Sequence, residues 1–537
     1  MKNTQPHKKS LASAGLRLSV LILFSRILGL VREQTKARFL GTSVYADAFT
    51  IAFLIPNLCR RLFAENSISV AFIPTFRGYL ETADTDERKA ETRQFIAATF
   101  TLVSFLTAAF VACGMLAAPL LVRIFYARTD TGVIPETVLL TRIMFPYLLA
   151  ISIAAFFQGI LNGVNIFSPS GFTPILFNII VIAATYVLSP YTANPARAMA
   201  IGVTTGGCVQ ALFQLPYVIK TGWTVSFTTL KKAFCNPGSR RVIALVGPTI
   251  IGMAAYQLND IVSTALAGKA GEGIVSSLQY SLRLQELILG IFAVSIASVI
   301  LPDLSGLAKR QDWQAFSSML GLAIRIIMLI TIPTTFYSLI TGRDLISLIY
   351  KDRRFTEESV MLTLEAFRFH IGGLCFIALN RVIAPAFYAQ GNTKLPTLAG
   401  IIGFACNIAF ALLLTGPMKG GGIALALSAA SLANTVMLLL FLKKTSVPNI
   451  SSIVAASLAY MVKLIILSAA AAIPAWLILP YLRSACAGAP QTRLIVYGIP
   501  AAAAGFVFAA AGILLLAITK DPVAMLAVRK IKRTPKD

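Results

Sequence analysis

Long apolar runs recur along the chain, and short stretches that hold most of the charged residues separate them. A run of about 20 apolar residues is long enough for one helical crossing of a lipid bilayer. Fourteen runs of this kind lie near residues 13–38, 45–74, 94–118, 137–163, 171–190, 197–219, 241–268, 273–302, 315–341, 360–390, 395–415, 421–442, 453–480 and 493–519. We therefore expect an all-α integral membrane protein with 14 transmembrane helices.

The composition indicates a membrane protein and changes how the net charge of the chain is interpreted. Of the 537 residues, 57% are hydrophobic and 13% are charged, far from the balance of a soluble globular protein. A net charge of +25 would suggest nucleic acid as the partner of a soluble chain. In a membrane protein, basic loops that face an anionic leaflet explain this charge better, so we expect no nucleic-acid partner. The seven cysteines are scattered without a CxxC spacing, which indicates neither a metal site nor a disulfide framework.

The loops predict the orientation of the helices. An even number of crossings places both termini on one side, and the two tails and the connection at 220–241 are rich in Lys and Arg. The positive-inside rule then places both termini in the cytoplasm. Because no small-residue cleavage site follows the first apolar run, we interpret that run as a retained helix. The charged stretch 77–93 is expected to be a solvated cytoplasmic loop.

The chain resembles itself at an offset of about 224–228 residues, since Pro119–Tyr126 parallels Arg343–Tyr350 and Ser69–Pro74 parallels Ala297–Pro302. An even number of helices separates the copies, so the repeats share one topology. Parallel repeats are a transporter architecture in which the substrate site lies between the halves. We expect a basic tail at 1–12, a six-helix N-lobe at 13–220, a cytoplasmic linker at 221–240, a six-helix C-lobe at 241–443, two further helices at 444–520 and a basic tail at 521–537.

Several arginines lie where the hydrocarbon core of a bilayer should exclude them: Arg26, Arg32, Arg60, Arg61 and Arg283. A guanidinium stays protonated, and at the centre of a lone helix each would cost roughly 2.5–3.5 kcal/mol on insertion scales. Such residues usually face a bundle interior or a water-filled cavity. Arginines that converge on one cavity would form a binding site for a large anion.

The position of each arginine leaves alternatives open. Arg32 lies close enough to a helix end to snorkel as an interfacial anchor, whereas Arg26 lies deeper. A helix break near Gly29 would bring both into one cavity. Because Arg60 and Arg61 are adjacent and point in different directions, we expect at most one of them to face that cavity.

The acidic residues in the apolar segments also have two interpretations. Glu65 follows the adjacent arginine pair closely enough for an intrahelical ion pair, and Asp47 at the start of its segment fits a helix N-terminal charge. Arg283 and Glu286 are three residues apart, a spacing that lets them pair. Asp260 could serve as a cation or proton site.

The strongest motifs lie in the first two segments, at Phe24–Glu33 (FSRILGLVRE), Ala46–Phe49 (ADAF) and Leu54–Glu65 (LIPNLCRRLFAE). Further motifs lie at Tyr280–Glu286 (YSLRLQE) and Ala384–Tyr388 (APAFY). In this order, along nearly the whole chain, they resemble the MurJ (MviN) family of lipid II flippases. That family belongs to the multidrug/oligosaccharidyl-lipid/polysaccharide exporter superfamily.

The resemblance implies two six-helix lobes around a cationic cavity, which move an undecaprenyl-diphosphate-linked peptidoglycan precursor across the bacterial inner membrane by alternating access. The last two helices are expected to form a groove for the polyprenyl tail. The implied partners are lipid II, membrane lipids and cell-wall synthesis proteins, and no cofactor or catalytic residue is implied. By matching positions, the implied substrate-binding residues are Arg26, Arg32, Arg60 and Arg283, and the implied gating residues or charge partners are Asp47, Glu65 and Glu286.

The sequence departs from the family in one respect. Some members bind a sodium ion between the seventh and eleventh helices through two aspartates and an asparagine. Asn407 matches the asparagine, but Ser263 and Ala411 stand at the aspartate positions. This argues against sodium coupling, although Asp260, one turn from Ser263, is a substitute ligand to consider. The membrane potential acting on the cavity charges is the alternative driving force.

The sequence bears differently on three functions other than lipid II flipping. A flippase for another polyprenyl-diphosphate-linked oligosaccharide would need the same cavity chemistry, so the sequence leaves it open. A cationic-drug antiporter would need an acidic, aromatic cavity, which the arginines contradict. A membrane enzyme lacks support, because the chain shows no paired-carboxylate, Ser–His–Asp or metal-ligand constellation among its residues and has only two histidines.

Overall fold

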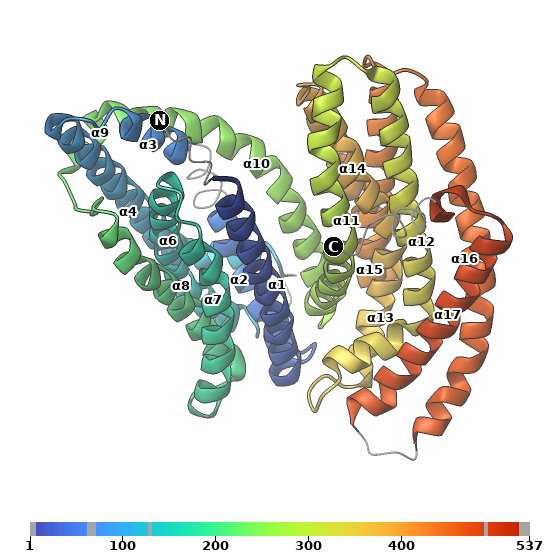
Figure 1. The fold of residues 1–537 in the computed structure, drawn as a ribbon. Helices are drawn as coiled ribbons and strands as arrows, with labels where there is room; N and C mark the ends of the chain where they lie inside the picture. The colour runs from blue at the N-terminus through green and yellow to red at the C-terminus, as the bar shows by residue number, and fades with distance from the viewer. Residues whose placement is uncertain (1–6, 62–70, 127–131, 488–491, 526–537) are drawn as a thin grey trace. The chain divides into compact units, whose positions relative to one another are not determined.

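The structure, a computed structural model, describes residues 7–61, 71–126, 132–487 and 492–525, and all regular secondary structure within these ranges is helical (Figure 1). The α-helices are α1 (His7–Leu40), α2 (Val44–Cys59), α3 (Ile73–Glu81), α4 (Asp86–Arg123), α5 (Ile134–Met144), α6 (Pro146–Gly163), α7 (Ser168–Leu188), α8 (Pro195–Lys220), α9 (Leu230–Cys235), α10 (Pro237–Ala270), α11 (Ile274–Lys309), α12 (Trp313–Tyr350), α13 (Glu357–Gly372), α14 (Leu374–Ala389), α15 (Lys394–Leu442), α16 (Ile450–Ala487) and α17 (Ile499–Ile518). A 3-10 turn, η3 (Ser189–Tyr191), follows α7, and a π-helical turn, η4 (Leu494–Gly498), precedes α17.

Many of these helices can cross a membrane. Within the described ranges, eight helices are long and apolar enough to do so, and a ninth span results if the bent pair α13–α14 counts as one. The all-α, multi-pass architecture predicted from the apolar runs is therefore confirmed. The number of 14 crossings stays a prediction.

Several predicted segments differ in detail from the helices. The charged stretch 77–93 is a loop only at 82–85: α3 continues to Glu81, and α4 begins at Asp86, with Thr85 accepting a hydrogen bond from the Arg88 amide as its N-cap. The loop prediction was wrong because this stretch of both charge signs continues helices whose next turns are apolar. The runs 395–415 and 421–442 share the label α15, but they are two helices joined across a kink at the non-helical Lys419.

Contacts divide the chain into two compact units, Met1–Glu272 and Gly273–Asp537. In the first, stacked and tilted aromatic rings fill the core between α3, α4 and α6, with Phe72 lying 5.5 Å from Phe76 and 4.6 Å from Phe156 between ring centroids. The boundary falls after α10, which contacts α2, α3, α4 and α9. The predicted lobe boundary at 241 rests on the sequence repeat and stays a prediction.

In the second unit, α16 and α17 pack on each other and on α12. A groove of about 380 Å³ lies between these three helices. Its lining is almost entirely apolar and includes Leu329, Pro333, Leu464, Phe508 and Leu516. Such a groove suits a hydrocarbon chain better than a polar ligand.

Candidate functional site

Two of the α1 arginines, Arg26 and Arg32, have different surroundings. α1 is continuous from His7 to Leu40, so no break at Gly29 brings Arg26 and Arg32 together. A single glycine lowers the stability of a helix by only about 1 kcal/mol, and the apolar neighbours of Gly29 have good helix propensity. Arg26 is exposed and makes no hydrogen bond or ion pair with a described residue, whereas the Arg32 side chain is only 15% exposed.

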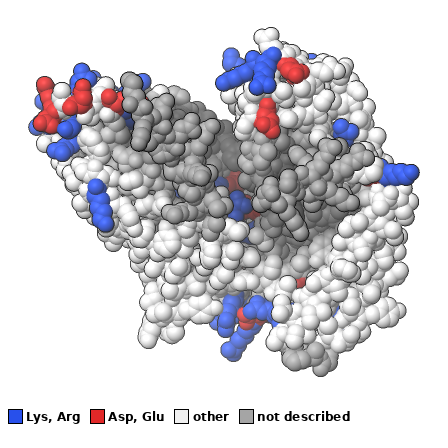
Figure 2. All heavy atoms as spheres, viewed as in Figure 1, with Lys and Arg blue, Asp and Glu red and all other residues white. Residues whose placement is uncertain are grey.

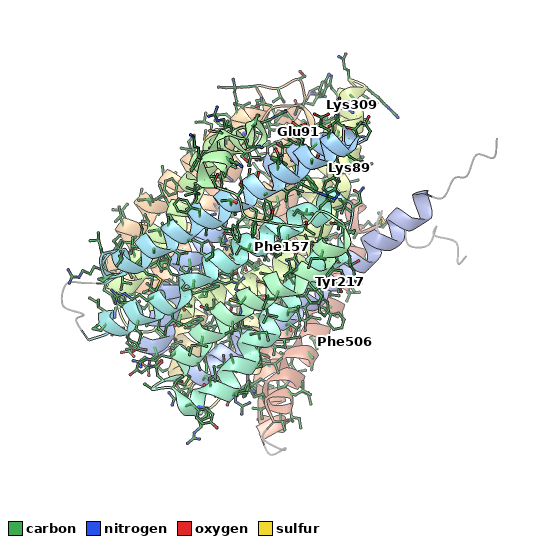
Figure 3. All side chains as sticks on the ribbon, turned by 90° about the vertical axis from the view of Figure 1, so that its left-hand side faces the viewer. Lys89, Glu91, Phe157, Tyr217, Lys309 and Phe506 are labelled. Carbon is green, nitrogen blue, oxygen red and sulfur yellow. The ribbon has the colours of Figure 1, made fainter. Side chains whose placement is uncertain are left out.

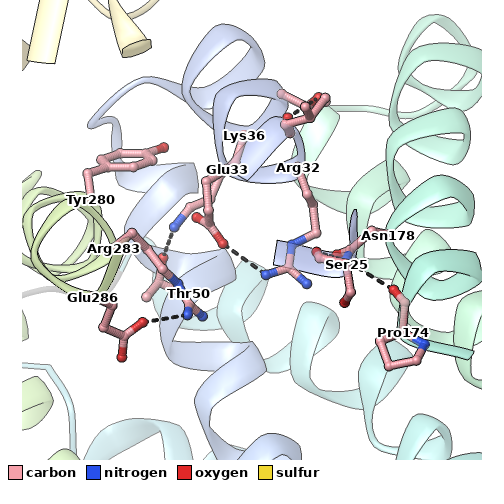
Figure 4. Close-up of polar contacts among 12 residues, drawn as sticks. Ser25, Arg32, Glu33, Lys36, Thr50, Pro174, Asn178, Tyr280, Arg283 and Glu286 are labelled. Carbon is pink, nitrogen blue, oxygen red and sulfur yellow. Dashed lines mark hydrogen bonds and ion pairs between the residues drawn. The ribbon is translucent and has the colours of Figure 1, made fainter. Parts of the chain in front are cut away.

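Arg32 points into the first unit. Its Nη2 donates a hydrogen bond to Glu33 Oε1 at 3.0 Å, and its Cζ lies 5.7 Å from the centroid of the Phe177 ring on α7. The next residue on α7, Asn178, donates from Nδ2 to the Ser25 carbonyl at 3.3 Å and so fastens α7 to α1 (Figure 4). This geometry favours a side chain buried within the helical bundle over the interfacial-anchor interpretation of Arg32.

Sequence reasoning missed two buried charges beside Arg32. Glu33 is 6% exposed, and Lys36 is 3% exposed. Lys36 Nζ donates to Thr50 Oγ1 on α2 at 2.6 Å and lies 6.0 Å from the Phe49 ring centroid (Figure 4). Both residues follow Arg32 in the same two turns of α1, a spacing that could have identified Lys36 as its helical neighbour.

Asp47 lies in the first turn of α2, where a carboxylate interacts favourably with the helix dipole. It is 5% exposed, so this charge is buried inside the unit instead of lying at a solvated helix end. A buried carboxylate needs polar or charged neighbours. The location therefore suits a role as a charge partner.

Arg60 and Arg61 follow Pro56 of α2 in a π-helical turn and take different partners. Arg60 Nε donates to Asn57 Oδ1 at 3.1 Å on its own helix. Arg61 Nη1 lies 3.3 Å from Asp260 Oδ2 and thereby links the end of α2 to α10. The alternative partner Glu65 lies outside the described residues. The two adjacent arginines thus point in different directions, as predicted.

In the second unit, Arg283 Nη1 donates to Glu286 Oε2 at 2.8 Å, the pair that the spacing predicted (Figure 4). The residues that flank Arg283 hold its helix in place. Ser281 Oγ lies 2.7 Å from His370 Nδ1, and Gln285 donates to the His370 carbonyl. Since His370 lies on α13, these contacts fasten the Arg283 turn of α11 to α13.

The residues considered for a cation site belong to different units. Asp260 and the half-buried Ser263 lie on α10, and Asp260 forms the ion pair with Arg61. Asn407 and Ala411 lie buried on α15, and an alanine side chain offers no ligand oxygen. A cation site formed by these residues stays a prediction.

Comparison with known sequences identifies close relatives. The family model described as "Lipid II flippase MurJ" matches residues 36–485. A "Probable lipid II flippase MurJ" of Treponema pallidum is 48% identical over 527 residues, which cover 98% of this chain and 99% of the relative. The "Lipid II flippase MurJ" of Burkholderia cenocepacia is 31% identical over 447 residues, covering 82% of this chain and 85% of the relative.

Solved structures share the fold. A lipid II flippase MurJ in an inward closed conformation matches with a TM-score of 0.75 and 23% identity over 96% of this chain and 99% of the other. An inward-facing multidrug resistance transporter of the MATE family, in the MOP superfamily, matches with a TM-score of 0.66 and 14% identity over 82% of this chain and 98% of the other. At these identities the likeness concerns the fold alone.

Proposed function

The chain belongs to the lipid II flippase MurJ family, and from this premise we propose that it moves lipid II from the inner to the outer leaflet of the bacterial cytoplasmic membrane. Lipid II is a peptidoglycan precursor linked to a polyprenyl carrier by a diphosphate. Moving its polar head through hydrocarbon unaided would expose charged and hydrogen-bonding groups to a medium that cannot solvate them. A flippase provides a polar route through the membrane.

The surroundings of Arg32 carry this proposal. A guanidinium has five N–H donors in a fixed fork that fits phosphate oxygens. Among the described residues, Arg32 uses one hydrogen bond to Glu33, and the Phe177 ring packs against its planar group. The remaining donors can bind the diphosphate while the carboxylate and the ring hold the side chain in position.

Further arginines extend the binding site. We assign Arg26, Arg60 and Arg283 to the diphosphate and its attached sugars, with Asp47, Glu65 and Glu286 as charge partners that adjust when substrate enters. Glu286 lies 2.8 Å from Arg283 in a partly exposed ion pair. Exchange of that carboxylate for a phosphate would let the arginine bind substrate and keep an anionic partner at both stages.

In the proposed mechanism, two six-helix lobes (13–220 and 241–443) expose the arginines alternately to each side of the membrane. The groove between α12, α16 and α17 accommodates the polyprenyl chain in the hydrocarbon layer, because its lining is apolar. Both termini lie in the cytoplasm. The membrane potential supplies the driving force, with a cation at Asp260, Ser263 and Asn407 as the alternative source. Cell-wall synthesis proteins are the expected protein partners.

Complementation tests the proposed function. The chain is expressed in a bacterium depleted of its own lipid II flippase, and lipid II that reaches the outer leaflet is measured. Wild type and Arg38→Ala should restore it, whereas Arg32→Ala should not; Arg38 is the matched control because it is exposed on the same helix. Suppose that wild type inserts but does not restore lipid II in the outer leaflet, and that it does restore export of another polyprenyl-diphosphate-linked oligosaccharide. That lipid-linked oligosaccharide would then replace lipid II as the substrate.

A further inference from the structure

The connection between α8 and α10 lies against the side of α4. The backbone amide of Thr228 donates to Thr101 Oγ1 at 3.0 Å, and the ring of Phe227 lies 4.9 Å from that of Phe100 between centroids. Within α9, Ala233 is fully buried against Ala98 and Leu102. This connection, residues 221–236, is therefore docked along α4 over about one turn.

Its level on α4 coincides with the change from a charged to an apolar surface. The first turns of α4, up to Arg93, carry most of its charges, and its exposed apolar side chains begin at Phe105 and Leu106. At a rise of about 1.5 Å per residue, Thr101 lies about 6 Å from Phe105 and about 12 Å from Arg93 along the axis. Figure 3 shows Lys89 at one end of the first unit and Phe157 further along it. The connection thus lies where the headgroup layer of the bilayer is expected.

The connection presents a mixed apolar and basic surface. Phe227 is 71% exposed, Phe234 43% and Leu230 37%, and the exposed Lys231 and Lys232 lie between Leu230 and Phe234. We name these five residues the linker surface. Exposed aromatic and aliphatic groups beside lysines are typical of segments that lie in the plane of a membrane interface.

The lysines of the linker surface differ from the first two basic residues of α4, which form ion pairs. At the start of α4, Lys89 lies 3.1 Å from Asp86, and Arg88 lies 3.9 Å from Asp84. Among the described residues, neither Lys231 nor Lys232 has a carboxylate within ion-pair distance. Figure 2 shows the mixed charges gathered at the end of the first unit, where α9 and the start of α4 lie in Figure 1.

The backbone of α9 is fixed at both ends, so the linker surface is presented in one orientation. Thr229 caps its N-terminus by accepting a hydrogen bond from the Lys232 amide. Arg240 Nε donates to the Phe234 carbonyl in its last turn at 2.9 Å. Asn236 then caps α10 by accepting from the Ser239 amide. A preorganised surface binds without ordering a flexible segment first.

We propose that the linker surface is a binding site for anionic phospholipid headgroups, with Phe227, Leu230 and Phe234 inserted at the acyl boundary and Lys231 and Lys232 bound to phosphates. It extends the lipid-facing surface of α4 into the headgroup layer. Each lysine near an anionic surface contributes about a fivefold gain in partition. The site lies apart from the arginines of the proposed flipping route, so it stands or falls independently of the proposed function.

Hydrogen exchange of the full-length protein in nanodiscs tests the site. Wild type is measured in phosphatidylcholine and in phosphatidylcholine mixed with phosphatidylglycerol, at low and high salt. Backbone amides of residues 226–236 should exchange several-fold more slowly with the anionic lipid, and high salt should reduce the difference. The Lys231→Gln/Lys232→Gln variant should lose it. The Arg88→Gln/Lys89→Gln variant, with the same loss of charge at the same end of the unit, should retain it.

Equal exchange of wild type in the two lipids would overturn the proposal. So would slow exchange in both lipids that is unchanged by Lys231→Gln/Lys232→Gln, since that result would mean apolar insertion or a protein partner without headgroup binding. Protection of the α4 amides near Thr101 reports in each variant whether the connection remains docked. The wild-type comparison between lipids decides the question even if a variant fails to fold.

Discussion

Arg483 on α16 donates two hydrogen bonds to Asp344 on α12, from Nε to Oδ1 at 3.0 Å and from Nη2 to Oδ2 at 2.6 Å. The Asp344 side chain is 2% exposed and that of Arg483 37%. Removing the arginine leaves a buried carboxylate unpaired, whereas removing the aspartate leaves an arginine that can reach solvent. We expect Arg483→Ala to lower the free energy of unfolding by about 3 kcal/mol and Asp344→Ala by less, measured by thermal unfolding in detergent.

The control for this pair is the more exposed bridge between Arg493 and Asp352, at 3.2 Å. Exposed ion pairs contribute about 0–1 kcal/mol, so Arg493→Ala should change stability little. If Arg493→Ala and Arg483→Ala destabilise equally, burial of Asp344 is not the source of the effect.

Arg32 should be sensitive to geometry as well as to charge. Arg32→Lys keeps the positive charge but loses the planar fork that binds phosphate through two parallel bonds. Loss of one charge-assisted hydrogen bond, about 1.5 kcal/mol, corresponds to roughly a tenfold fall in flipping rate. Flipping is measured with purified protein and labelled lipid II in vesicles. Arg38→Lys serves as the control, and equal rates for Arg32→Lys and wild type would show that charge alone suffices.

The sequence predicted those contacts that depend on one helix and missed those that depend on packing. The Arg283–Glu286 pair follows from the helical period alone. Arg61 instead pairs with Asp260, 199 residues away, and Lys463 pairs with Asp521, 58 residues away, at 2.7 Å. Which helix lies beside another is decided by side-chain packing across many residues, and one sequence contains no direct record of it.

The helical architecture was predictable for a related reason. An apolar run long enough to cross a bilayer must satisfy its backbone hydrogen bonds internally, which leaves the helix as the structure available to it. The same reasoning does not locate irregularities. The bend of 41° between α13 and α14 falls at Gly373, whereas α1 continues through Gly29 without a break. Such breaks depend on neighbouring helices as well as on the residue itself.

Asp521, just beyond the end of α17, should make stability depend on pH. Burial alone would raise the pKa of its carboxyl, but hydrogen bonds from Lys463, the Ala524 amide and Tyr460 outweigh burial and hold the pKa below its usual range. A lowered folded-state pKa stabilises the protein above the unfolded value, about 3.9, and this stabilisation disappears as pH falls through the folded value.

The Asp521→Asn variant tests this dependence. At neutral pH it should unfold more easily than wild type, by on the order of 2 kcal/mol, because the charge-assisted bonds to Lys463 and Tyr460 are weakened. The difference should shrink as the pH falls below about 4, where the wild-type carboxyl also becomes protonated. Thermal unfolding of both proteins across this range measures the difference. A constant difference at all pH values would mean that the asparagine disturbs packing and that ionisation is not involved.

Lipid II transport by this chain should not require sodium. The family resemblance places the sodium-ligand aspartates where this chain has Ser263 and Ala411, and Asp260 is already paired with Arg61 at 3.3 Å. Hard cations select several oxygen ligands, and a neutral hydroxyl with one amide is a poor set. Replacing sodium with choline in the vesicle assay should therefore leave the rate within about twofold, because no coordination energy is lost. Collapsing the membrane potential should slow transport, since moving one elementary charge across a potential of 100 mV changes its free energy by about 2.3 kcal/mol. A strong sodium requirement that Asp260→Asn abolishes would instead assign the coupling ion to Asp260, and it would require the Arg61 pair to open during the cycle.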